Sequence, residues 1–409
     1  HGTKNRVILG DQGNFSDNNR ADDFQLGYAQ GRGRNLAPLN INGALGLIVM
    51  NAPREDGLFP TTFFLRTTGG LFEERPGQFI QRSGCKNTAG AGKPCDRAQP
   101  ADLTEFRLAI PAYFNNDDYI DVILLGSKNA GQYPVKLFTG SAEGIFTASP
   151  VHGPGTIARD GAVLDADNDG RFDVWLTGIQ KERRHRRTRN SLYAFSPEGE
   201  FLRKPLDSKV PVIKLKTGPV VSGDFDNDGD EDVITYEADG KNRFIFSVWE
   251  NIDKGRFRRT LFTDQANTGF PRSVAVADYN LDGSLDLLFG DGAGHKGVIG
   301  VGGYVLIEGV PNGNHWLQLD LRDPWHLRGL GAKVFVTTGK RVMLRGSFGG
   351  THEAAQNHVR LHFGLGRYDR ADIRVVWPDG ISTELKNVPV DRVLEIQYPV
   401  APAPLQKPG

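Results

Sequence analysis

The stretch Asp165-Ala-Asp167-Asn-Asp169-Gly170-Arg-Phe-Asp173 is the most informative part of the chain. Oxygen-bearing side chains stand at positions 1, 3, 5 and 9 of this nine-residue loop, and a glycine stands at position 6. A hard cation such as Ca²⁺ takes about six to eight oxygen ligands, which alternate residues of a tight loop can supply. Gly170 permits the sharp turn that a residue with a Cβ resists. One acidic loop is equally compatible with a solvated turn, so the interpretation depends on repetition.

The same spacing occurs in two further loops, at 224–232 and 278–286, and in a reduced copy at 113–121. The reduced copy has Tyr113 at position 1 and Asp118 in place of the glycine. We therefore predict about three tight calcium sites and a weak fourth one. The predicted ligands, counting the residue at position 7 for its main-chain carbonyl, are Asp165, Asp167, Asp169, Arg171 and Asp173; Asp224, Asp226, Asp228, Asp230 and Asp232; Asp278, Asn280, Asp282, Ser284 and Asp286; and, in the reduced copy, Asn115, Asp117 and Asp121.

The residues that follow each loop exclude an EF-hand. An EF-hand places a bidentate Glu at position 12, at the start of a helix. Here position 12 is Leu176, Thr235 or Phe289. The last Asp of each loop precedes a short apolar run, such as Val-Trp-Leu after Asp173, which is typical of a buried strand. The sequence thus predicts calcium loops between strands.

The loops belong to a longer repeat. Their last Asp residues are at 121, 173, 232 and 286, which gives a period of 52 to 59 residues. After each loop comes a second phrase of strand, glycine turn, Phe and strand, as in 193–201. About four strands per period are typical of a propeller blade. A weaker loop phrase around Asn40 and Asn42 has no carboxylate, so we expect it to be empty, its turn held by asparagine side chains.

The number of blades follows from counting these phrases. Five loop phrases are visible, and residues 7–15 (Val-Ile-Leu-Gly-Asp-Gln-Gly-Asn-Phe) are a sixth copy of the second phrase that lacks its own loop phrase. This suggests that the chain starts within a blade that its other end completes. We predict an all-β fold in which residues 1–312 form a calcium-binding β-propeller. Six or seven blades are favoured and five are also compatible.

After residue 312 the pattern changes to strands with two-residue alternation, as in Leu317-Gln-Leu319-Asp-Leu321. Turn sequences such as Pro378-Asp-Gly380 separate them. Residues 313–400 are therefore predicted to form a small β-sandwich-like domain. Residues 401–409 form a proline-rich tail that we expect to be extended or disordered.

Charge and composition exclude some classes of binding partner. Lys and Arg together number 49, as do Asp and Glu, which argues against nucleic acid as a partner. No apolar run is long enough to cross a bilayer, so we expect no membrane span. The sequence starts at His1 rather than Met, and we expect that a signal peptide has been removed.

The two cysteines, Cys85 and Cys95, flank a segment rich in small residues and without metal-ligand partners. The natural interpretation is a local disulfide formed in an oxidising compartment, and the alternative is two free thiols in a loop. Weak calcium sites fill only where calcium is plentiful, as it is outside cells. Both features therefore predict an extracellular, secreted protein.

The loop phrases, above all Gly223-Asp-Phe-Asp-Asn-Asp-Gly-Asp-Glu-Asp232, resemble the FG-GAP/VCBS repeats of integrin α-subunit propellers and of many secreted proteins. The C-terminal region resembles the ASPIC/UnbV domain through Asn314-His-Trp-Leu317, Gly329-Leu-Gly-Ala-Lys-Val334, Arg360-Leu-His-Phe-Gly-Leu-Gly366 and Val376-Trp-Pro-Asp-Gly380. The two in this order resemble the cartilage acidic protein family and its bacterial relatives. The resemblance implies a calcium-stabilised extracellular propeller with adhesion or matrix contacts.

Two classes of function remain open. The leading hypothesis is a secreted adhesion, matrix or scaffold protein that binds an extracellular protein or a glycan, or that associates with itself as a structural subunit. The alternative is a carbohydrate-active lyase or hydrolase that uses the propeller funnel. The chain contains no nucleophile–base arrangement, phosphate loop or cofactor fingerprint, and carboxylates that hold Ca²⁺ cannot donate protons near neutral pH. We therefore predict a protein that is not an enzyme.

Overall fold

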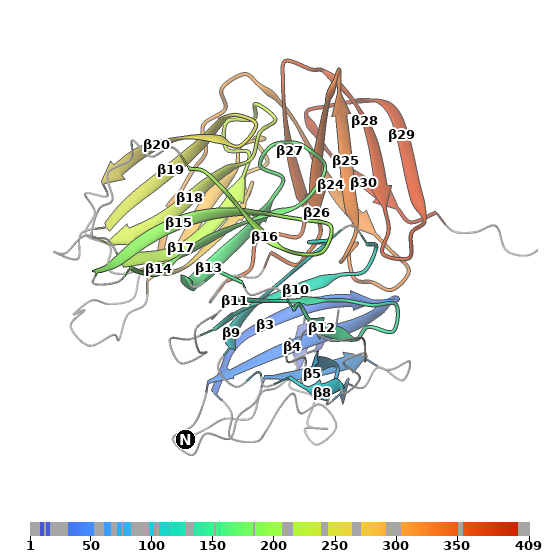
Figure 1. Ribbon diagram of the computed structural model, residues 1–409. Helices are drawn as coiled ribbons and strands as arrows, with labels where there is room; N and C mark the ends of the chain where they lie inside the picture. The colour runs from blue at the N-terminus through green and yellow to red at the C-terminus, as the bar shows by residue number, and fades with distance from the viewer. Residues whose placement is uncertain are drawn as a thin grey trace, which may run out of the picture.

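Strands make up all the regular secondary structure of the described residues, as Figure 1 shows for the computed structural model. The structure describes residues between 9 and 399, with gaps of which the longest are 17–31, 53–60, 83–97, 127–134, 207–215, 264–270 and 292–303. The short apolar runs after each acidic loop form the second strand of a sheet, as their β-branched and aromatic residues predict. The prediction of an all-β chain is confirmed.

Each repeat folds into one sheet, which we number as blades 1 to 5. Blades 1, 3 and 4 are antiparallel meanders of four strands in chain order, and blade 5 has three described strands. In blade 2 the meander is β9 to β12, with β9 as its first strand, and two further strands join it because β7 pairs in parallel with β12. Blade 1 contains β3 (Arg32–Ile41), β4 (Ala44–Ala52), β5 (Thr62–Arg66) and β6 (Phe72–Glu74); blade 2 contains β7 (Phe79–Arg82), β8 (Ala98–Pro100), β9 (Phe106–Ala112), β10 (Asp121–Gly126), β11 (Val135–Thr139) and β12 (Phe146–Ala148); blade 3 contains β13 (Thr156–Leu164), β14 (Asp173–Glu182), β15 (His185–Phe195) and β16 (Phe201–Lys204); blade 4 contains β17 (Lys216–Gly223), β18 (Asp232–Ala238), β19 (Phe244–Asp253) and β20 (Arg256–Thr263); blade 5 contains β21 (Pro271–Ala277), β22 (Asp286–Asp291) and β23 (Tyr304–Ile307).

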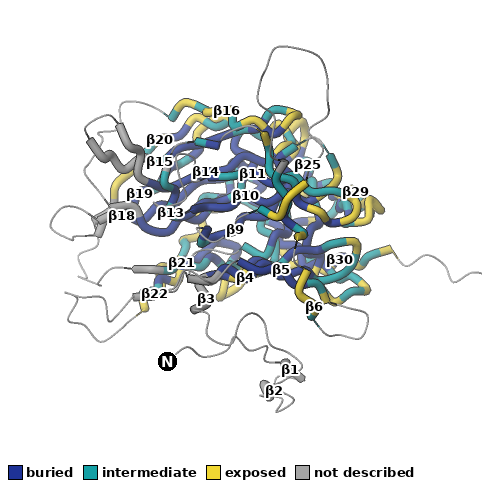
Figure 2. The backbone as a smooth tube through the Cα atoms, turned by 60° about the horizontal axis from the view of Figure 1, so that its bottom comes forward, coloured by how far each residue is buried: buried dark blue, intermediate teal, exposed yellow. Residues whose placement is uncertain are grey.

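The first strands of the blades lie next to one another along the inside of the propeller. β3 packs against β9, β9 against β13, β13 against β17, and β17 against β21. Figure 2 shows that β9 and β10 are almost entirely buried, and the described part of β14, residues 173–178, is buried as well. Between blades the core is aromatic: the ring centroids of Trp175 and Trp249 are 5.2 Å apart. Neighbouring blades are thus held together by buried side chains rather than by strand pairing.

The blade count differs from the favoured prediction. The described strands form five blades, which is the smallest count that the repeats allow, rather than six or seven. Within the described residues, the extra phrase near the N-terminus forms a separate two-stranded sheet of β1 (Leu9–Asp11) and β2 (Asn14–Ser16). A phrase without its own acidic loop lacks the first two strands on which a blade is built.

The C-terminal domain is a sandwich of two sheets, as predicted. One sheet has the order β27-β24-β30 and the other has the order β26-β25-β28-β29. Alternating residues of both sheets, such as Leu319 and Val334, meet in a hydrophobic cluster that draws all its buried members from residues 317–396. The strands are β24 (His315–Arg322), β25 (Lys333–Thr338), β26 (Arg341–Gly346), β27 (Leu361–Gly366), β28 (Arg370–Val376), β29 (Ser382–Pro389) and β30 (Arg392–Gln397).

Candidate calcium loops and the domain that covers them

Each predicted calcium loop joins the first and second strands of its blade. Gly170, Gly229 and Gly283, at position 6, have φ values of +82°, +99° and +89°, so the left-handed turn requires glycine there. Position 4 is also left-handed, and it is occupied by Asn168, Asn227 or Leu281. Asparagine tolerates this conformation, whereas leucine is strained in it.

Position 1 anchors each loop through the backbone. The carboxylate of Asp224 accepts the N–H groups of Asp228 at 3.0 Å and of Gly229 at 2.8 Å. Asp165 and Asp278 accept the N–H groups of positions 5 and 6 in the same way, at 3.0 to 3.1 Å. The Asp at position 9 accepts the N–H group of position 2 in all four acidic loops. These carboxylates therefore fix the loop shape as well as offering oxygen atoms to a cation.

Two of the loops gather carboxylates closely enough to hold a metal ion. Ligand atoms of Asp165, Asp167 and Asp169 lie within 4.8 Å of one another, and so do those of Asp224, Asp226 and Asp232. Burial raises the pKa of Asp165 to about 8 and that of Asp224 to about 8. A divalent cation would favour the ionised form of both groups, because it compensates the charge that burial penalises. The donor sets thus fit a hard cation with oxygen ligands.

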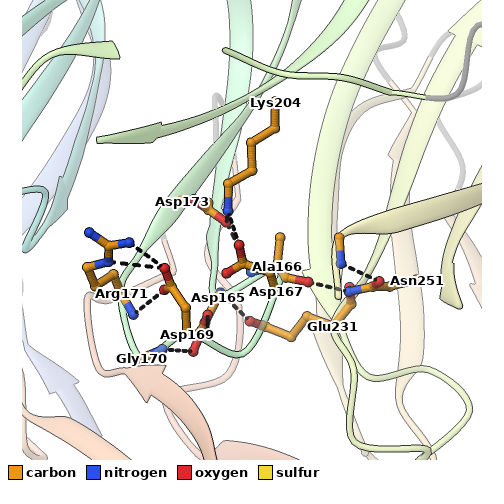
Figure 3. A network of polar contacts seen from close by, with 11 residues as sticks. Asp165, Ala166, Asp167, Asp169, Gly170, Arg171, Asp173, Lys204, Glu231 and Asn251 are labelled. Carbon is orange, nitrogen blue, oxygen red and sulfur yellow. Dashed lines mark hydrogen bonds and ion pairs between the residues drawn. The ribbon is translucent and has the colours of Figure 1, made fainter. Parts of the chain in front are cut away.

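In the loop at 165–173, positively charged side chains of the same blade contact the carboxylates (Figure 3). The ammonium group of Lys204, in β16, lies 2.6 Å from Asp167 Oδ2 and 3.0 Å from Asp173 Oδ2. The guanidinium of Arg171 binds Asp169, with Nη2 2.6 Å from Oδ2. Three of the four carboxylates in this loop therefore already contact a positive side chain from the same blade.

The loop at 224–232 receives its positive charges from the C-terminal domain instead. Arg341 Nη2 lies 3.5 Å from Asp230 Oδ2, and Arg345 Nη1 lies 3.2 Å from Glu231 Oε2. Arg345 and Glu231 are both more than nine-tenths buried. The backbone N–H of Gly364 donates to Asp224 Oδ2 at 3.1 Å, so the domain contacts a predicted metal ligand directly.

Asn227 and Gly364 are in close contact where this loop meets the domain. His362 Nε2 lies 2.7 Å from Asn227 Oδ1, and the N–H of Gly366 donates to the carbonyl of Asn227 at 2.8 Å. A Cβ at Gly364 would lie 2.3 Å from the Cα of Asn227. Glycine at this position is therefore required for docking.

The C-terminal domain places one side chain against position 6 of four of the five loops. A Cβ at Gly43, Gly229 or Gly283 would lie within 2.6 Å of Trp325, Arg341 or Trp316. At the fourth loop Asp118 stands at position 6 and binds Lys333 Nζ at 3.0 Å. Gly170 is the exception, with no atom within 4 Å of the position of its Cβ. The domain thus covers the loop ends of blades 1, 2, 4 and 5 and leaves position 6 of blade 3 open.

The loop at 278–286 is covered as well but offers fewer charges. Asp278 Oδ2 accepts hydrogen bonds from Gly283 N and from the amide of Gln318, in β24. The amide of Asn280 donates to Asp282 Oδ2 at 3.0 Å. Ser284 is buried, and its hydroxyl has no hydrogen-bond partner among the described residues. Asn280 thus takes the place of a carboxylate and occupies an oxygen of its neighbour.

The reduced loop at 113–121 uses its altered positions for docking. The hydroxyl of Tyr113, at position 1, donates to the carbonyl of Gly331 at 2.7 Å. Lys333 Nζ, which binds Asp118, also lies 4.7 Å from the centroid of the Tyr113 ring. Asn115 and Asp117 hydrogen-bond to each other, with Asn115 Nδ2 2.7 Å from Asp117 Oδ2, and Asp121 accepts three backbone N–H groups. The positions that depart from the calcium pattern are the ones that contact the C-terminal domain.

The loop phrase around Asn40 is shortened to a two-residue hairpin. β3 and β4 pair up to Ile41 and Ala44, so the turn is Asn42-Gly43. Both turn residues have positive φ, as a hairpin of this length requires. Asn40 Oδ1 accepts the N–H of Gly43 at 2.8 Å, which confirms the predicted side-chain support of the turn.

A cavity of about 180 Å³ is lined by the first strands of blades 2 to 5 and by the C-terminal domain. Its acidic lining residues are Glu231 and Asp278. Glu231 binds Arg345 and the N–H of Asp165, and Asp278 binds Gln318 and two loop amides. Both carboxylates thus hold the loops and the domain together.

Sequence reasoning missed three side chains of this region: Lys204, Glu231 and Arg345. Glu231 stands between the predicted ligands Asp230 and Asp232, and its burial at 5 % exposure is not visible in the spacing pattern. Lys204 and Arg345 reach the loops from 31 and more than 110 residues along the chain, and no local motif marks them. The predicted disulfide of Cys85 and Cys95 lies outside the described residues.

Two family models match the chain. The FG-GAP-like repeat matches residues 224–289, and ASPIC and UnbV matches residues 326–403. The sequence is 27 % identical to human cartilage acidic protein 1 over 290 residues, which covers 68 % of this chain and 42 % of the human protein. It is 30 % identical to the Xenopus tropicalis protein of the same name over 198 residues, 46 % of this chain and 30 % of that protein. The chain spans less than half the length of these relatives.

Among solved structures, a GH43 beta-xylosidase/alpha-arabinofuranosidase from a compost microbial metagenome aligns with a TM-score of 0.35 at 11 % identity, over 68 % of this chain and 92 % of the enzyme. BBS1N, solved in complex with ARL6DN, aligns with a TM-score of 0.36 at 8 % identity, over 90 % of this chain and 94 % of that one. Similarity at this level carries no functional argument. The chain therefore contains a region that matches the FG-GAP-like repeat, followed by a region that matches ASPIC and UnbV, and it is similar in sequence to cartilage acidic protein 1.

Proposed function

We propose that this protein is a secreted, calcium-stabilised scaffold that makes adhesion or matrix contacts outside cells. The proposal rests on one observation: the same loops offer calcium ligands and bind the C-terminal domain. Those at 224–232 and 278–286 have the donor sets of calcium sites, and the same loops bind the C-terminal domain. Calcium in these loops would compensate buried carboxylates at the interface and so hold the two domains in one fixed arrangement.

Rigid domain placement suits a protein that presents its outer surfaces to partners. The partner class that we propose is an extracellular protein or a glycan, or a second copy of the chain, as in a structural subunit. The names of the relatives and the equal numbers of acidic and basic residues support this class over nucleic acid. No helix in the described part of the chain is long and apolar enough to cross a membrane.

Calcium titration tests the first half of the proposal. Native mass spectrometry and calorimetry should detect at least two bound ions, and removing them with EGTA should lower the melting temperature. Asp228→Ala should remove one ion, while Lys340→Ala, an exposed lysine in a turn of the C-terminal domain, should leave the count unchanged. A protein that binds no calcium would contradict the proposal.

Binding to immobilised matrix components tests the second half. Retention on collagen or sulfated-glycan surfaces should be measured in calcium and in EGTA, with light scattering to detect self-association. We expect retention or assembly in calcium and its loss in EGTA. Turnover of polysaccharide substrates without retention on any surface would favour the enzymatic alternative.

A further inference from the structure

The predicted calcium loops of blade 3 (165–173) and blade 4 (224–232) contact each other directly (Figure 3). Glu231 Oε2 accepts the N–H group of Asp165 at 3.0 Å, so position 8 of the blade 4 loop holds position 1 of the blade 3 loop. Glu231 is 5 % exposed and Asp165 is fully buried. This buried bond joins a predicted calcium ligand of one loop to a residue that stands between two predicted ligands of the other.

Asn251, in β19, makes a second connection between the same loops. Its side chain donates to the carbonyl of Ala166, at position 2 of the blade 3 loop, at 2.7 Å and to the carbonyl of Glu231 at 3.3 Å. Its backbone N–H group donates to Asp232 Oδ1, at position 9 of the blade 4 loop, at 2.8 Å. A single residue that is 1 % exposed therefore contacts both loops.

The other blades show that neither connecting side chain is needed to form a loop of this kind. Where blade 4 has Glu231, the other acidic loops have an apolar residue at position 8, namely Ile120, Phe172 and Leu285. The residue that corresponds to Asn251, whose N–H group donates to the Asp at position 9, is Gly140 in blade 2 and Gly309 in blade 5. Glycine keeps this bond but has no side chain that could reach a neighbouring loop. The polar side chains of blade 4 thus serve the contact with blade 3.

Calcium in one loop would fix the groups that position the other loop. An ion in the blade 4 loop would hold Asp230 and Asp232, and with them Glu231, which lies between them. Asp230 also accepts a hydrogen bond from the side chain of Asn168, at position 4 of the blade 3 loop. Ordering a loop costs conformational entropy, so a loop that is already ordered by its neighbour binds an ion more tightly.

Electrostatics acts in the opposite direction. Filling one loop removes part of the attraction that its carboxylates exert on an ion in the other loop. Positive side chains already offset this attraction, because Arg345 lies 3.2 Å from Glu231 and Lys204 lies 2.6 Å from Asp167. The part that acts through solvent is screened beyond about 8 Å at physiological ionic strength. We therefore expect the effect of ordering to prevail.

We propose that the calcium sites of blades 3 and 4 are coupled through Glu231 and Asn251, so that an ion in either loop raises the calcium affinity of the other. The inference rests on the proposed calcium binding and adds a way in which it is regulated. Because coupling between two sites is reciprocal, each ion should raise the affinity of the other loop by the same factor, about ten-fold. The two sites would then fill over a narrower range of calcium concentration than independent sites do.

Calcium titration of the full-length chain by calorimetry tests the coupling. Asp169→Ala removes a ligand of the blade 3 loop and so identifies the binding event of that loop, and Asp228→Ala does the same for blade 4. Neither side chain takes part in the bonds between the loops. Asp228→Ala should weaken the blade 3 event about ten-fold, and Asp169→Ala should weaken the blade 4 event by the same factor.

Asn251→Gly tests the proposed route of the coupling. The variant has the residue that blades 2 and 5 have at this place, and it retains every predicted ligand and the N–H group that binds Asp232. It should remove most of the coupling. The matched control is Ser247→Gly, at another buried residue of β19, whose hydroxyl binds Arg259 rather than a loop. The control should keep the full coupling.

Hydrogen exchange gives a second readout. At a calcium concentration that fills only the blade 4 loop, exchange of the amides at 165–173 should slow in the parent protein and in Ser247→Gly. In Asn251→Gly it should stay at the rate measured without calcium. This measurement detects ordering of the blade 3 loop before its own ion binds.

Each result decides the proposal. Reciprocal weakening that Asn251→Gly abolishes confirms it. Sites that bind independently, a blade 3 loop that binds more tightly or not at all, or coupling that is equal in Asn251→Gly and Ser247→Gly would overturn it and leave the proposed calcium binding intact. Only a chain that binds no calcium overturns the proposed function as well. If Asn251→Gly does not fold, Asp169→Ala and Asp228→Ala still show whether the two sites are coupled.

Discussion

The loops at 165–173 and 224–232 have nearly the same sequence pattern but obtain their positive charges from different places. In the first, Lys204 and Arg171 of the same blade contact three of the four carboxylates. The second is covered by the C-terminal domain, which brings Arg341 and Arg345 to it. The spacing of carboxylates alone therefore does not rank calcium sites. What ranks them is which other cations the fold delivers to the same oxygen atoms.

The comparison implies that calcium matters more in the covered loop. In the loop at 165–173 an entering ion must displace an ammonium group that already contacts positions 3 and 9. In the loop at 224–232 the described residues place no lysine among positions 1, 3 and 9, and burial raises the pKa of Asp232 well above its usual range. We therefore expect the second loop to bind calcium more tightly than the first, although the sequence ranks them equally.

The largest expected effect comes from removing position 1 of the covered loop. Asp224→Ala should remove a calcium ion, leave the N–H groups of Gly229 and Gly364 unpaired, and cost about 3 to 4 kcal/mol of unfolding free energy in calcium. Asp167→Ala is the control, because Asp167 is partly exposed and contacts Lys204 rather than the domain. Its cost should be about 1 kcal/mol. Equal losses in urea unfolding would contradict the distinction between the loops.

Two glycines at position 6 compare a covered loop with the open one. Both Gly283→Ala and Gly170→Ala force alanine into a left-handed turn, which costs about 1 kcal/mol. At Gly283 the new Cβ would also lie 1.9 Å from Trp316 Nε1, whereas at Gly170 it meets no atom within 4 Å. We expect an additional loss of about 1 to 3 kcal/mol for Gly283→Ala, because the rigid indole must move. Thermal unfolding of both variants measures the difference, and its absence would mean that the domain does not sit on this loop.

Replacing Lys204, which contacts the loop at 165–173, should change stability by a smaller amount, and the change should depend on whether calcium is present. Lys204→Met keeps much of the side-chain volume but removes the charge, so Asp167 and Asp173 lose their cation. Without calcium the variant should be about 1 to 2 kcal/mol less stable than the parent. With calcium the loss should disappear, and native mass spectrometry should count one ion more than in the parent protein. An unchanged ion count would show that Lys204 does not compete with the metal.

The sequence was sufficient for features that are local. Acidic spacing located the loops between first and second strands, two-residue alternation located the C-terminal sandwich, and the family resemblance is supported by the matching models. The blade count was harder to predict, because residues 7–15 have the sequence pattern of a blade, yet β1 and β2 form a separate two-stranded sheet. The role of Tyr113 as a docking residue could not be foreseen, since its partner Gly331 lies 218 residues away.

The covering domain itself explains why the loops looked unequal in sequence. From the sequence alone, Tyr113 and Asp118 are interpreted as positions that have lost a calcium ligand or the turn glycine. In the structure both side chains bind the C-terminal domain. A pattern that counts calcium ligands cannot distinguish a lost ligand from a residue that contacts the C-terminal domain until the position of that domain is known.

The smallest expected effect concerns position 4, where the covered loop at 278–286 departs from the other two. Leu281 has φ of +60°, while Asn168 and Asn227 occupy the same position with φ of +53° and +58°. A leucine in this conformation is strained by about 1 kcal/mol, and its side chain is 55 % exposed, so it buries little in return. Leu281→Asn should therefore stabilise the protein by about 0.5 to 1 kcal/mol in thermal unfolding. Leu288→Asn, at an exposed leucine inside β22, is the control and should destabilise, because asparagine is unfavourable in a strand. If Leu281→Asn also destabilises, leucine at this position must make a contact that the exposure of its side chain does not reveal.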